Sequence, residues 1–206
     1  QLPPIVFDLD GNGVQLISPT ASNVMFDAND DGHRQRTGWF SSGDGVLAID
    51  RNGDGVINSG SEISFRQNGA LSDLEGLAEF DTNENGMIDS GDERYGELLV
   101  WRDENQDGFS QSHEIATLSR YGIASINLTR GDVALGNGDV SQNAVLATGT
   151  FTWRDGTIGS LADVALGYEG EDPAPPEGED DRTADTRGRR RSRVWDQADW
   201  MGQRDV

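Results

Sequence analysis

One six-residue pattern, Asp-x-Asx-x-Asx-Gly, occurs five times in this chain, and it constrains the fold more than any other feature. The copies begin at Asp8, Asp27, Asp50, Asp81 and Asp103. Calcium binds six to eight oxygen atoms at about 2.3–2.6 Å, and side chains at positions 1, 3 and 5 of a curled loop converge on one point. Glycine at position 6 makes the sharp turn, often with a positive φ, at the least cost. The spacing therefore predicts five calcium-binding loops.

The candidate calcium ligands are the side chains at positions 1, 3 and 5, the backbone carbonyl at position 7, and acidic side chains further along each loop. They are Asp8, Asp10, Asn12 and Val14 in loop 1; Asp27, Asn29, Asp31 and His33 in loop 2; Asp50, Asn52, Asp54, Val56 and Glu62 in loop 3; Asp81, Asn83, Asn85, Met87, Asp89 and Asp92 in loop 4; and Asp103, Asn105, Asp107, Phe109 and Glu114 in loop 5. Because the loops differ in completeness, we predict that they hold three to five calcium ions.

The five loops differ in the acid that completes each ligand set. Loop 5 satisfies the whole EF-hand pattern, because Glu114 at position 12 can bind calcium through both carboxylate oxygens. Loop 4 has Asp92 at that position, and in loop 3 Glu62 comes one residue late. Loops 1 and 2 have no acid there and need a carboxylate from elsewhere, for which Asp44 is a candidate. A single incomplete copy also fits an Asp/Asn/Gly turn that binds no ion.

The charge of the chain is strongly acidic, with 37 Asp and Glu against 16 basic residues, all of them arginine, and a net charge of −21. Such a charge repels nucleic acid and anionic membranes, and no apolar run approaches the ~20 residues of a bilayer-spanning helix. We therefore expect no nucleic-acid partner and no membrane span. Clustered carboxylates repel one another without metal, so the chain is expected to stay loose or unfolded until calcium supplies folding free energy.

The spacing of apolar residues predicts an α+β domain of short antiparallel strands with a central EF-hand-like helix-loop-helix pair. Helical spacing predicts three short helices, which flank loops 4 and 5 and share the middle helix, at 71–80, 94–101 and 115–121. Strands are predicted where β-branched and apolar residues alternate or run together, at 4–8, 23–27, 46–50, 123–129 and 144–154. The Asp155-Gly156 pair after the last of these predicts a β-hairpin.

Composition divides the chain into three parts. Residues 1–168 carry the apolar runs and the calcium loops, and we predict that they form the folded module. Residues 169–193 are acidic and Pro-containing and then Arg-rich, which predicts a disordered linker. Residues 194–206 are predicted to be a docking segment or the start of a next region. Because the chain begins at Gln1 without an initiator Met, we expect it to be a piece of a longer protein.

Several motifs in one order resemble the self-processing module of FrpC-type RTX proteins. They are the run from Pro4 to Gly13, Arg36 to Trp39, Asp50 to Glu62, Leu99 to Asp103, and Gly122 to Ile126. The resemblance implies a module of a bacterial protein that leaves the cell by type I secretion, unfolded, and folds on meeting external calcium. It also implies that the remainder of a larger secreted or cell-surface protein is its partner.

In processing members of that family, folding cleaves an Asp-Pro bond before the module and can join the released aspartyl group to a lysine. The proline that corresponds to the cleavage point is Pro4, but Pro3 precedes it and has no carboxyl group to attack the peptide bond. We therefore predict a structural calcium-binding module without catalytic residues. A calcium-activated autoprotease is one alternative, and a calcium-ordered adhesion module with a protein or glycan ligand is the other.

Overall fold

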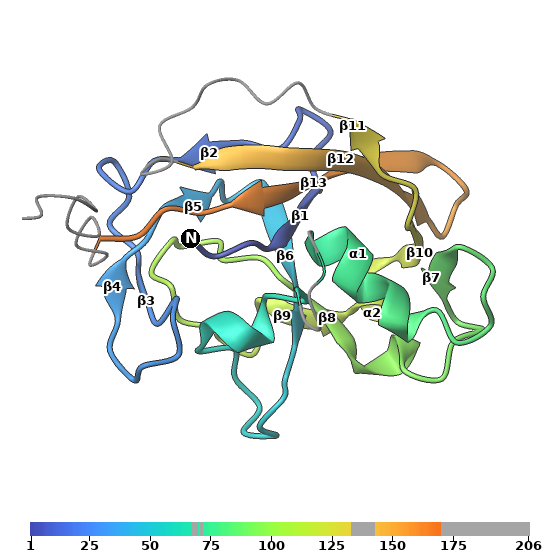
Figure 1. Ribbon diagram of the computed structural model, residues 1–206, viewed down its shortest axis with the longest axis horizontal. Helices are drawn as coiled ribbons and strands as arrows, with labels where there is room; N and C mark the ends of the chain where they lie inside the picture. The colour runs from blue at the N-terminus through green and yellow to red at the C-terminus, as the bar shows by residue number, and fades with distance from the viewer. Residues whose placement is uncertain (67–69, 71, 133–142, 170–206) are drawn as a thin grey trace, which may run out of the picture. The chain divides into compact units, whose positions relative to one another are not determined.

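The computed structural model describes residues 1–66, 70, 72–132 and 143–169. Its main feature is a sheet of nine antiparallel strands in the order β7-β10-β12-β13-β1-β6-β8-β9, with β11 paired to β12 (Figure 1). These strands are β1 (Ile5–Asp8), β6 (Asp44–Ile49), β7 (Met87–Asp89), β8 (Leu98–Trp101), β9 (Ile115–Thr117), β10 (Ile123–Asn127), β11 (Gly131–Asp132), β12 (Ala144–Trp153) and β13 (Ile158–Ala165). Two small ribbons pair β2 (Leu16–Ile17) with β5 (Trp39–Phe40) and β3 (Met25–Phe26) with β4 (Gln35–Arg36).

The central strands β1 and β6 are buried along their whole length. Successive side chains of a strand point to opposite faces of the sheet. Ile5 and Phe7 accordingly belong to one apolar cluster, together with Leu47, whereas Val6 and Val46 belong to a second cluster. Because each face carries its own core, the short apolar runs at 4–8 and 46–50 have no polar side to turn toward water, and the predicted strands there are confirmed.

The expected α+β fold with an EF-hand helix pair is wrong, because the described residues are mostly β-strand. The helical segments are short: α1 (Asp73–Leu77), α2 (Leu118–Tyr121) and the 3-10 turns η1 (Gly60–Glu62), η2 (Ala78–Phe80) and η3 (Tyr95–Glu97). Two of the three predicted helices have short counterparts: the helix at 71–80 in α1 and η2, and the helix at 115–121 in α2, which begins only at Leu118 because Ile115–Thr117 form β9. The shared middle helix is replaced by η3 and strand β8.

The physical reason for this error is the ambiguity of short apolar runs. Leu98 and Trp101 are three residues apart, which fits a helix, but Leu98–Trp101 is also a continuous run that can fill the inside of a sheet. β8 pairs with β6 on one side and β9 on the other. Loop 5 therefore joins two antiparallel strands as a β-hairpin, where the EF-hand pattern predicts flanking helices.

The predicted strands at 123–129 and 144–154 are confirmed as β10 and β12, and the strand at 23–27 is reduced to β3. The predicted hairpin is also confirmed: β12 pairs with β13, and Gly156, with a φ of 87°, lies in the turn between them. Among the residues that the structure describes, no helix has the length and apolar character needed to cross a membrane. Apart from Glu169, the predicted linker 169–193 and the segment 194–206 lie outside the described residues.

Candidate calcium sites

Each of the five acidic loops begins at or just after an element that ends on a buried residue. β1 ends at Asp8 itself, and β3, β6 and β8 end one or two residues before the first aspartate of loops 2, 3 and 5. Loop 4 follows η2 in the same way. Because the strands are fixed by the core, the first carboxylate of every loop starts from an anchored backbone position.

All five loops curl by the same hydrogen bond, which the carboxylate at position 1 accepts from the backbone N–H of the glycine at position 6. The pairs are Gly13 to Asp8 at 3.0 Å, Gly32 to Asp27 at 2.9 Å, Gly55 to Asp50 at 3.0 Å, Gly86 to Asp81 at 2.8 Å and Gly108 to Asp103 at 2.9 Å. These glycines have φ values between 71° and 90°, so the predicted role of glycine as the sharp turn is confirmed in its geometry.

A second left-handed residue stands at position 4 of every loop. Gly11 and Gly53 adopt this conformation easily, whereas Asp30, Glu84 and Gln106 hold φ values of 57–58° despite carrying side chains. A residue other than glycine is uncommon in this region. Its recurrence at one position of three loops shows that the loop shape is dictated by the pattern as a whole and not by glycine alone.

In four loops, positions 3 and 5 hold one asparagine and one aspartate. The asparagine amide donates a hydrogen bond to the aspartate carboxylate. The donor–acceptor pairs are Asn12 to Asp10 at 2.7 Å, Asn29 to Asp31 at 3.0 Å, Asn52 to Asp54 at 3.0 Å and Asn105 to Asp107 at 2.9 Å. These side chains converge as the spacing predicts. The position-7 side chains of loops 3, 4 and 5 point to solvent, since Val56, Met87 and Phe109 are exposed.

Loop 1 obtains an additional carboxylate from the neighbouring strand. The register of β1 and β6 pairs Asp8 with Asp44, and the carboxylates of Asp8, Asp10 and Asp44 each bring an oxygen within 4.8 Å of the others. Asp44 is fully buried; its Oδ2 accepts hydrogen bonds from Gln15 N–H and the Ser41 hydroxyl, while its Oδ1 has no partner. Burial raises the pKa of Asp44, and the charges of Asp10 and Asp8 raise it further.

Loop 3 obtains its acid from the turn η1. Asp50, Asp54 and Glu62 bring carboxylate oxygens within 4.8 Å of one another, although Glu62 stands one residue beyond position 12. Glu62 is buried, its Oε2 accepts a 2.9 Å hydrogen bond from Asn58 N–H, and its Oε1 has no partner. The 3-10 turn thus makes the local adjustment that a late acid requires.

Loop 5 folds Glu114 back over its own backbone. Its two carboxylate oxygens accept hydrogen bonds from Glu104 N–H at 3.0 Å and Gln111 N–H at 3.2 Å. Asp103, at the start of the loop, is fully buried and accepts a 2.9 Å hydrogen bond from the indole N–H of Trp39. Burial raises the pKa of Asp103, and the nearby charge of Glu114 adds to the rise. The hydrogen bonds that Asp103 accepts from Gly108 N–H, Asp107 N–H and the Trp39 indole oppose it.

Loop 4 closes through Asp92, whose carboxylate accepts 2.8 Å hydrogen bonds from Thr82 N–H and Asp89 N–H. Burial of Asp92 acts to raise its pKa, but the backbone N–H groups of Asp89, Asn83 and Thr82 outweigh it, and the pKa is lowered. Asp92 is therefore held as an anion at the position that the pattern assigns to it.

Loop 2 is the least complete of the five. It brings no third acid to Asp27 and Asp31, and within the described ranges the only sets of three close acidic or histidine side chains are those of loops 1 and 3. The guanidinium of Arg34 donates to the carbonyl of Gly108 and lies 3.8 Å from the ring centre of Phe109. The Arg34 side chain thus ties loop 2 to loop 5. Its positive charge interacts with Asp27 and would compete there with a metal ion.

Further hydrogen bonds connect loop 3 to its neighbours. Ser61 N–H donates to the Asp30 carboxylate of loop 2 at 3.0 Å, and Ile57 N–H donates to the Ser110 hydroxyl of loop 5 at 2.7 Å. Loops 2, 3 and 5, which are far apart in sequence, therefore share one region of the structure.

The fold and the loops define a β-sheet module in which repeated acidic loops stand at the ends of strands. A family model for the SPM domain matches residues 5–167, and the chain belongs to the SPM domain family. It is also 35% identical, over 178 residues, to the iron-regulated protein FrpA of Neisseria meningitidis serogroup C. That match covers 79% of this chain and 15% of FrpA, so the chain spans only a small part of that relative. Both matches agree with the resemblance to FrpC-type modules that the motifs indicate.

Proposed function

We propose that this chain is a multi-site calcium-binding module whose folding is driven by calcium. The observation that carries the proposal is a pair of buried acids, Asp44 and Glu62, each with one carboxylate oxygen that has no hydrogen-bond partner. Each acid lies beside two further carboxylates of one loop. Buried polar groups are nearly always hydrogen-bonded, and an unpaired charged oxygen is especially costly. A hard divalent cation supplies the missing partner of each oxygen and offsets the repulsion between the acids.

The same argument connects calcium to folding. Three carboxylates that share one small site repel one another, and this repulsion is present only when the chain is folded. An ion that binds the folded chain and not the unfolded chain adds its binding free energy to the stability. The net charge of −21 adds to this repulsion when the chain becomes compact. Calcium therefore supplies folding free energy that offsets the repulsion among these carboxylates.

We place this module in a secreted or cell-surface bacterial protein. The supports are the similarity to FrpA and the resemblance to modules of type I-secreted RTX proteins. Calcium sites of extracellular modules have dissociation constants of about 10⁻⁴–10⁻³ M. Sites of that affinity stay empty inside a cell and fill outside it, so the chain remains unfolded during export. Self-processing is not part of the proposal, because Pro3 supplies no carboxyl group next to Pro4.

The roles of Asp44 and Glu62 are tested by calcium calorimetry on the variants Asp44→Asn and Glu62→Gln. Each substitution keeps the shape of the side chain and removes its charge, so the affinity of its own loop is expected to fall by about tenfold or more, because ligand charge sets calcium affinity. The exposed Glu84→Gln is the matched control, since Glu84 lies at a loop position that provides no ligand. If the three variants gave the same isotherm as the parent chain, the assignment of both sites would be wrong.

A further inference from the structure

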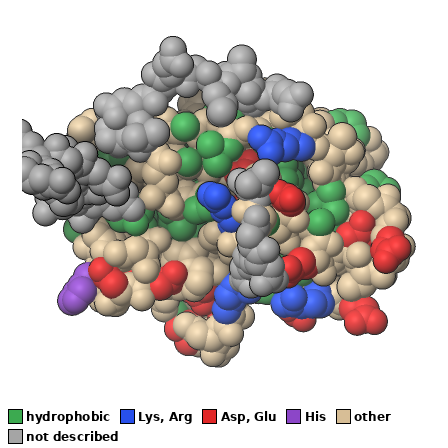
Figure 2. All heavy atoms as spheres, in the orientation of Figure 1, with side chains coloured by type: hydrophobic (Ala, Val, Ile, Leu, Met, Phe, Trp, Pro, Cys, Tyr) green, Lys and Arg blue, Asp and Glu red, His purple; other side chains and the backbone are tan. Residues whose placement is uncertain are grey.

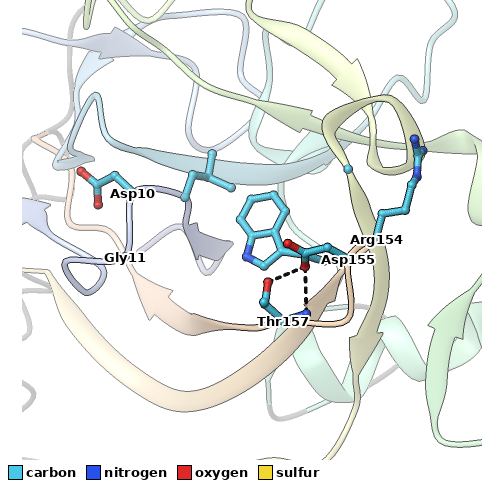
Figure 3. Close-up of a pocket in the computed structure, with 8 residues that line it drawn as sticks. Asp10, Gly11, Arg154, Asp155 and Thr157 are labelled. Atoms are coloured by element: carbon cyan, nitrogen blue, oxygen red, sulfur yellow. Dashed lines mark hydrogen bonds between the residues drawn. The ribbon is translucent and has the colours of Figure 1, made fainter.

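A groove with a volume of about 560 Å³ lies beside loop 1, and no predicted ligand set explains it. Loop 1 contributes Leu9 and Asp10 to its lining, and Figure 3 shows Asp10 on the side opposite Asp155 and Thr157. The end of β12 contributes Trp153, and the β12–β13 turn contributes Asp155 and Thr157. Ligand sites of proteins are typically hollows of about 300–1,000 Å³ that combine apolar and aromatic walls with a few polar groups. The groove has a volume in this range, with Leu9 and Trp153 as its apolar and aromatic groups and four polar side chains, Asp10, Arg154, Asp155 and Thr157, around them.

The aromatic group of the groove is Trp153, which is only half buried. Its indole packs edge-on against Phe151, with ring centres 4.9 Å apart, which fixes its orientation. Its Nε1–H has no hydrogen bond with any residue that the structure describes. Gly122, the left-handed residue that ends α2, also lines the groove, and a Cβ there would lie 3.9 Å from the indole. The absent side chain leaves space beside the ring.

The polar groups of the groove are also fixed in place. Asp155 accepts hydrogen bonds from Thr157 N–H at 2.9 Å and the Thr157 hydroxyl at 2.6 Å, both through Oδ1 (Figure 3). These bonds lower the pKa of Asp155, so its carboxylate is charged and Oδ2 is left to accept from a ligand. The guanidinium of Arg154 extends away from the Asp155 carboxylate and donates to Ser119.

We propose that this groove binds a neutral sugar ring of a glycan, which lies on the indole of Trp153 and donates a hydroxyl hydrogen bond to Asp155. The C–H face of a pyranose is apolar and matches an aromatic ring, while its hydroxyls serve both the Asp155 acceptor and the Trp153 N–H donor. The preference for a neutral ligand rests on the proposed function, because a calcium ion in loop 1 offsets the charge of Asp10. A groove open on one side suits a sugar at the end of a chain.

The experiment uses the calcium-saturated chain labelled with ¹⁵N and a panel of neutral probes, namely methyl glycosides of glucose, galactose, mannose and N-acetylglucosamine. The five tryptophans give five indole N–H signals, and the variant Trp153→Phe identifies the one from Trp153. At least one probe is expected to shift the Trp153 signal progressively and to leave the signals of Trp39 and Trp101 unchanged. Asp155→Ala is expected to weaken that probe's binding about tenfold or more, whereas Glu84→Gln leaves it unchanged.

Two outcomes overturn the sugar proposal. One is that no glycoside shifts the Trp153 signal at tens of millimolar. The other is that an arginine ester shifts it and the glycosides do not, which would make the groove a site for cationic side chains. Calcium uptake is measured on the same sample before any probe is added. A chain that takes up calcium and ignores sugars contradicts only this inference, and a chain that takes up no calcium contradicts the proposed function.

Discussion

Replacing Asp103 with alanine is expected to prevent the module from folding cooperatively even in millimolar calcium. The Asp103 carboxylate is fully buried and accepts hydrogen bonds from the Trp39 indole at 2.9 Å, from Gly108 N–H at 2.9 Å and from Asp107 N–H at 3.2 Å. The substitution removes a predicted calcium ligand, opens the loop and leaves the indole N–H buried without a partner. Removing one member of a buried charged network costs about 3–5 kcal/mol, a large fraction of the stability of a domain of this size.

The matched control for this variant is Asp107→Ala in the same loop. Asp107 is also a predicted ligand, but it is partly exposed and bonds only groups of loop 5. Asp107→Ala is expected to weaken calcium binding and to leave the tertiary signal at saturating calcium intact. Thermal unfolding followed by near-ultraviolet circular dichroism separates the two variants. An Asp103→Ala chain that melts within about 1 kcal/mol of the parent would contradict the role given to this carboxylate.

The second large effect is a pH dependence that comes from the buried acid Asp73 in α1. Burial raises the pKa of Asp73 to about 8, and the charge of Asp163 on β13 adds to the rise. Because the unfolded chain has a pKa near 3.8, the unfolded state loses this proton first as pH rises. The contribution of protonated Asp73 to the free energy of unfolding is full below about pH 4 and is lost progressively toward pH 8. The loss is on the order of 5 kcal/mol, since each pH unit in this range contributes about 1.4 kcal/mol.

The groups around Asp73 define the test of this pH dependence. Its carboxylate accepts from Phe65 N–H at 2.7 Å and the Ser64 hydroxyl at 3.3 Å, and Asp163, whose pKa burial also raises, accepts from Leu74 N–H at 3.1 Å. Asp73→Asn keeps the shape of the side chain and removes its titration. At saturating calcium, the variant is expected to gain stability over the parent steadily from pH 5 to pH 8. A constant difference between the two denaturation curves across this range would show that Asp73 does not titrate as stated.

The curled shape of the five acidic loops could be predicted from the sequence because its hydrogen bonds are local. A carboxylate at position 1 reaches the N–H at position 6 of its own loop, so the curl of Asp8 to Gly13 depends on six consecutive residues. Glu62 was also within reach of this reasoning, because it lies only one residue beyond the pattern. Asp44 required more: its place beside Asp8 follows from the register of β1 and β6, which the sequence alone does not determine.

The flanking elements could not be predicted from the loop pattern, because a calcium loop requires anchored ends and not helices in particular. Loop 5 matches the EF-hand pattern fully, yet it is flanked by strands. β8 ends two residues before Asp103, and β9 begins one residue after Glu114. The buried pair of acids at Asp73 and Asp163 was not identified from the sequence. Each stands in an ordinary run of residues, and only the packing of α1 against β13 places them together.

The most direct test of the account is a calcium titration of the chelator-treated chain, followed by near-ultraviolet circular dichroism and by the ¹H–¹⁵N spectrum. In chelator, the buried tryptophans Trp39 and Trp101 are expected to give no fixed tertiary signal and the amide peaks to crowd into a narrow range. Added calcium is expected to restore both signals together at about 10⁻⁴–10⁻³ M free ion. A dispersed spectrum and a full tertiary signal in chelator, with no change on adding calcium, would contradict it.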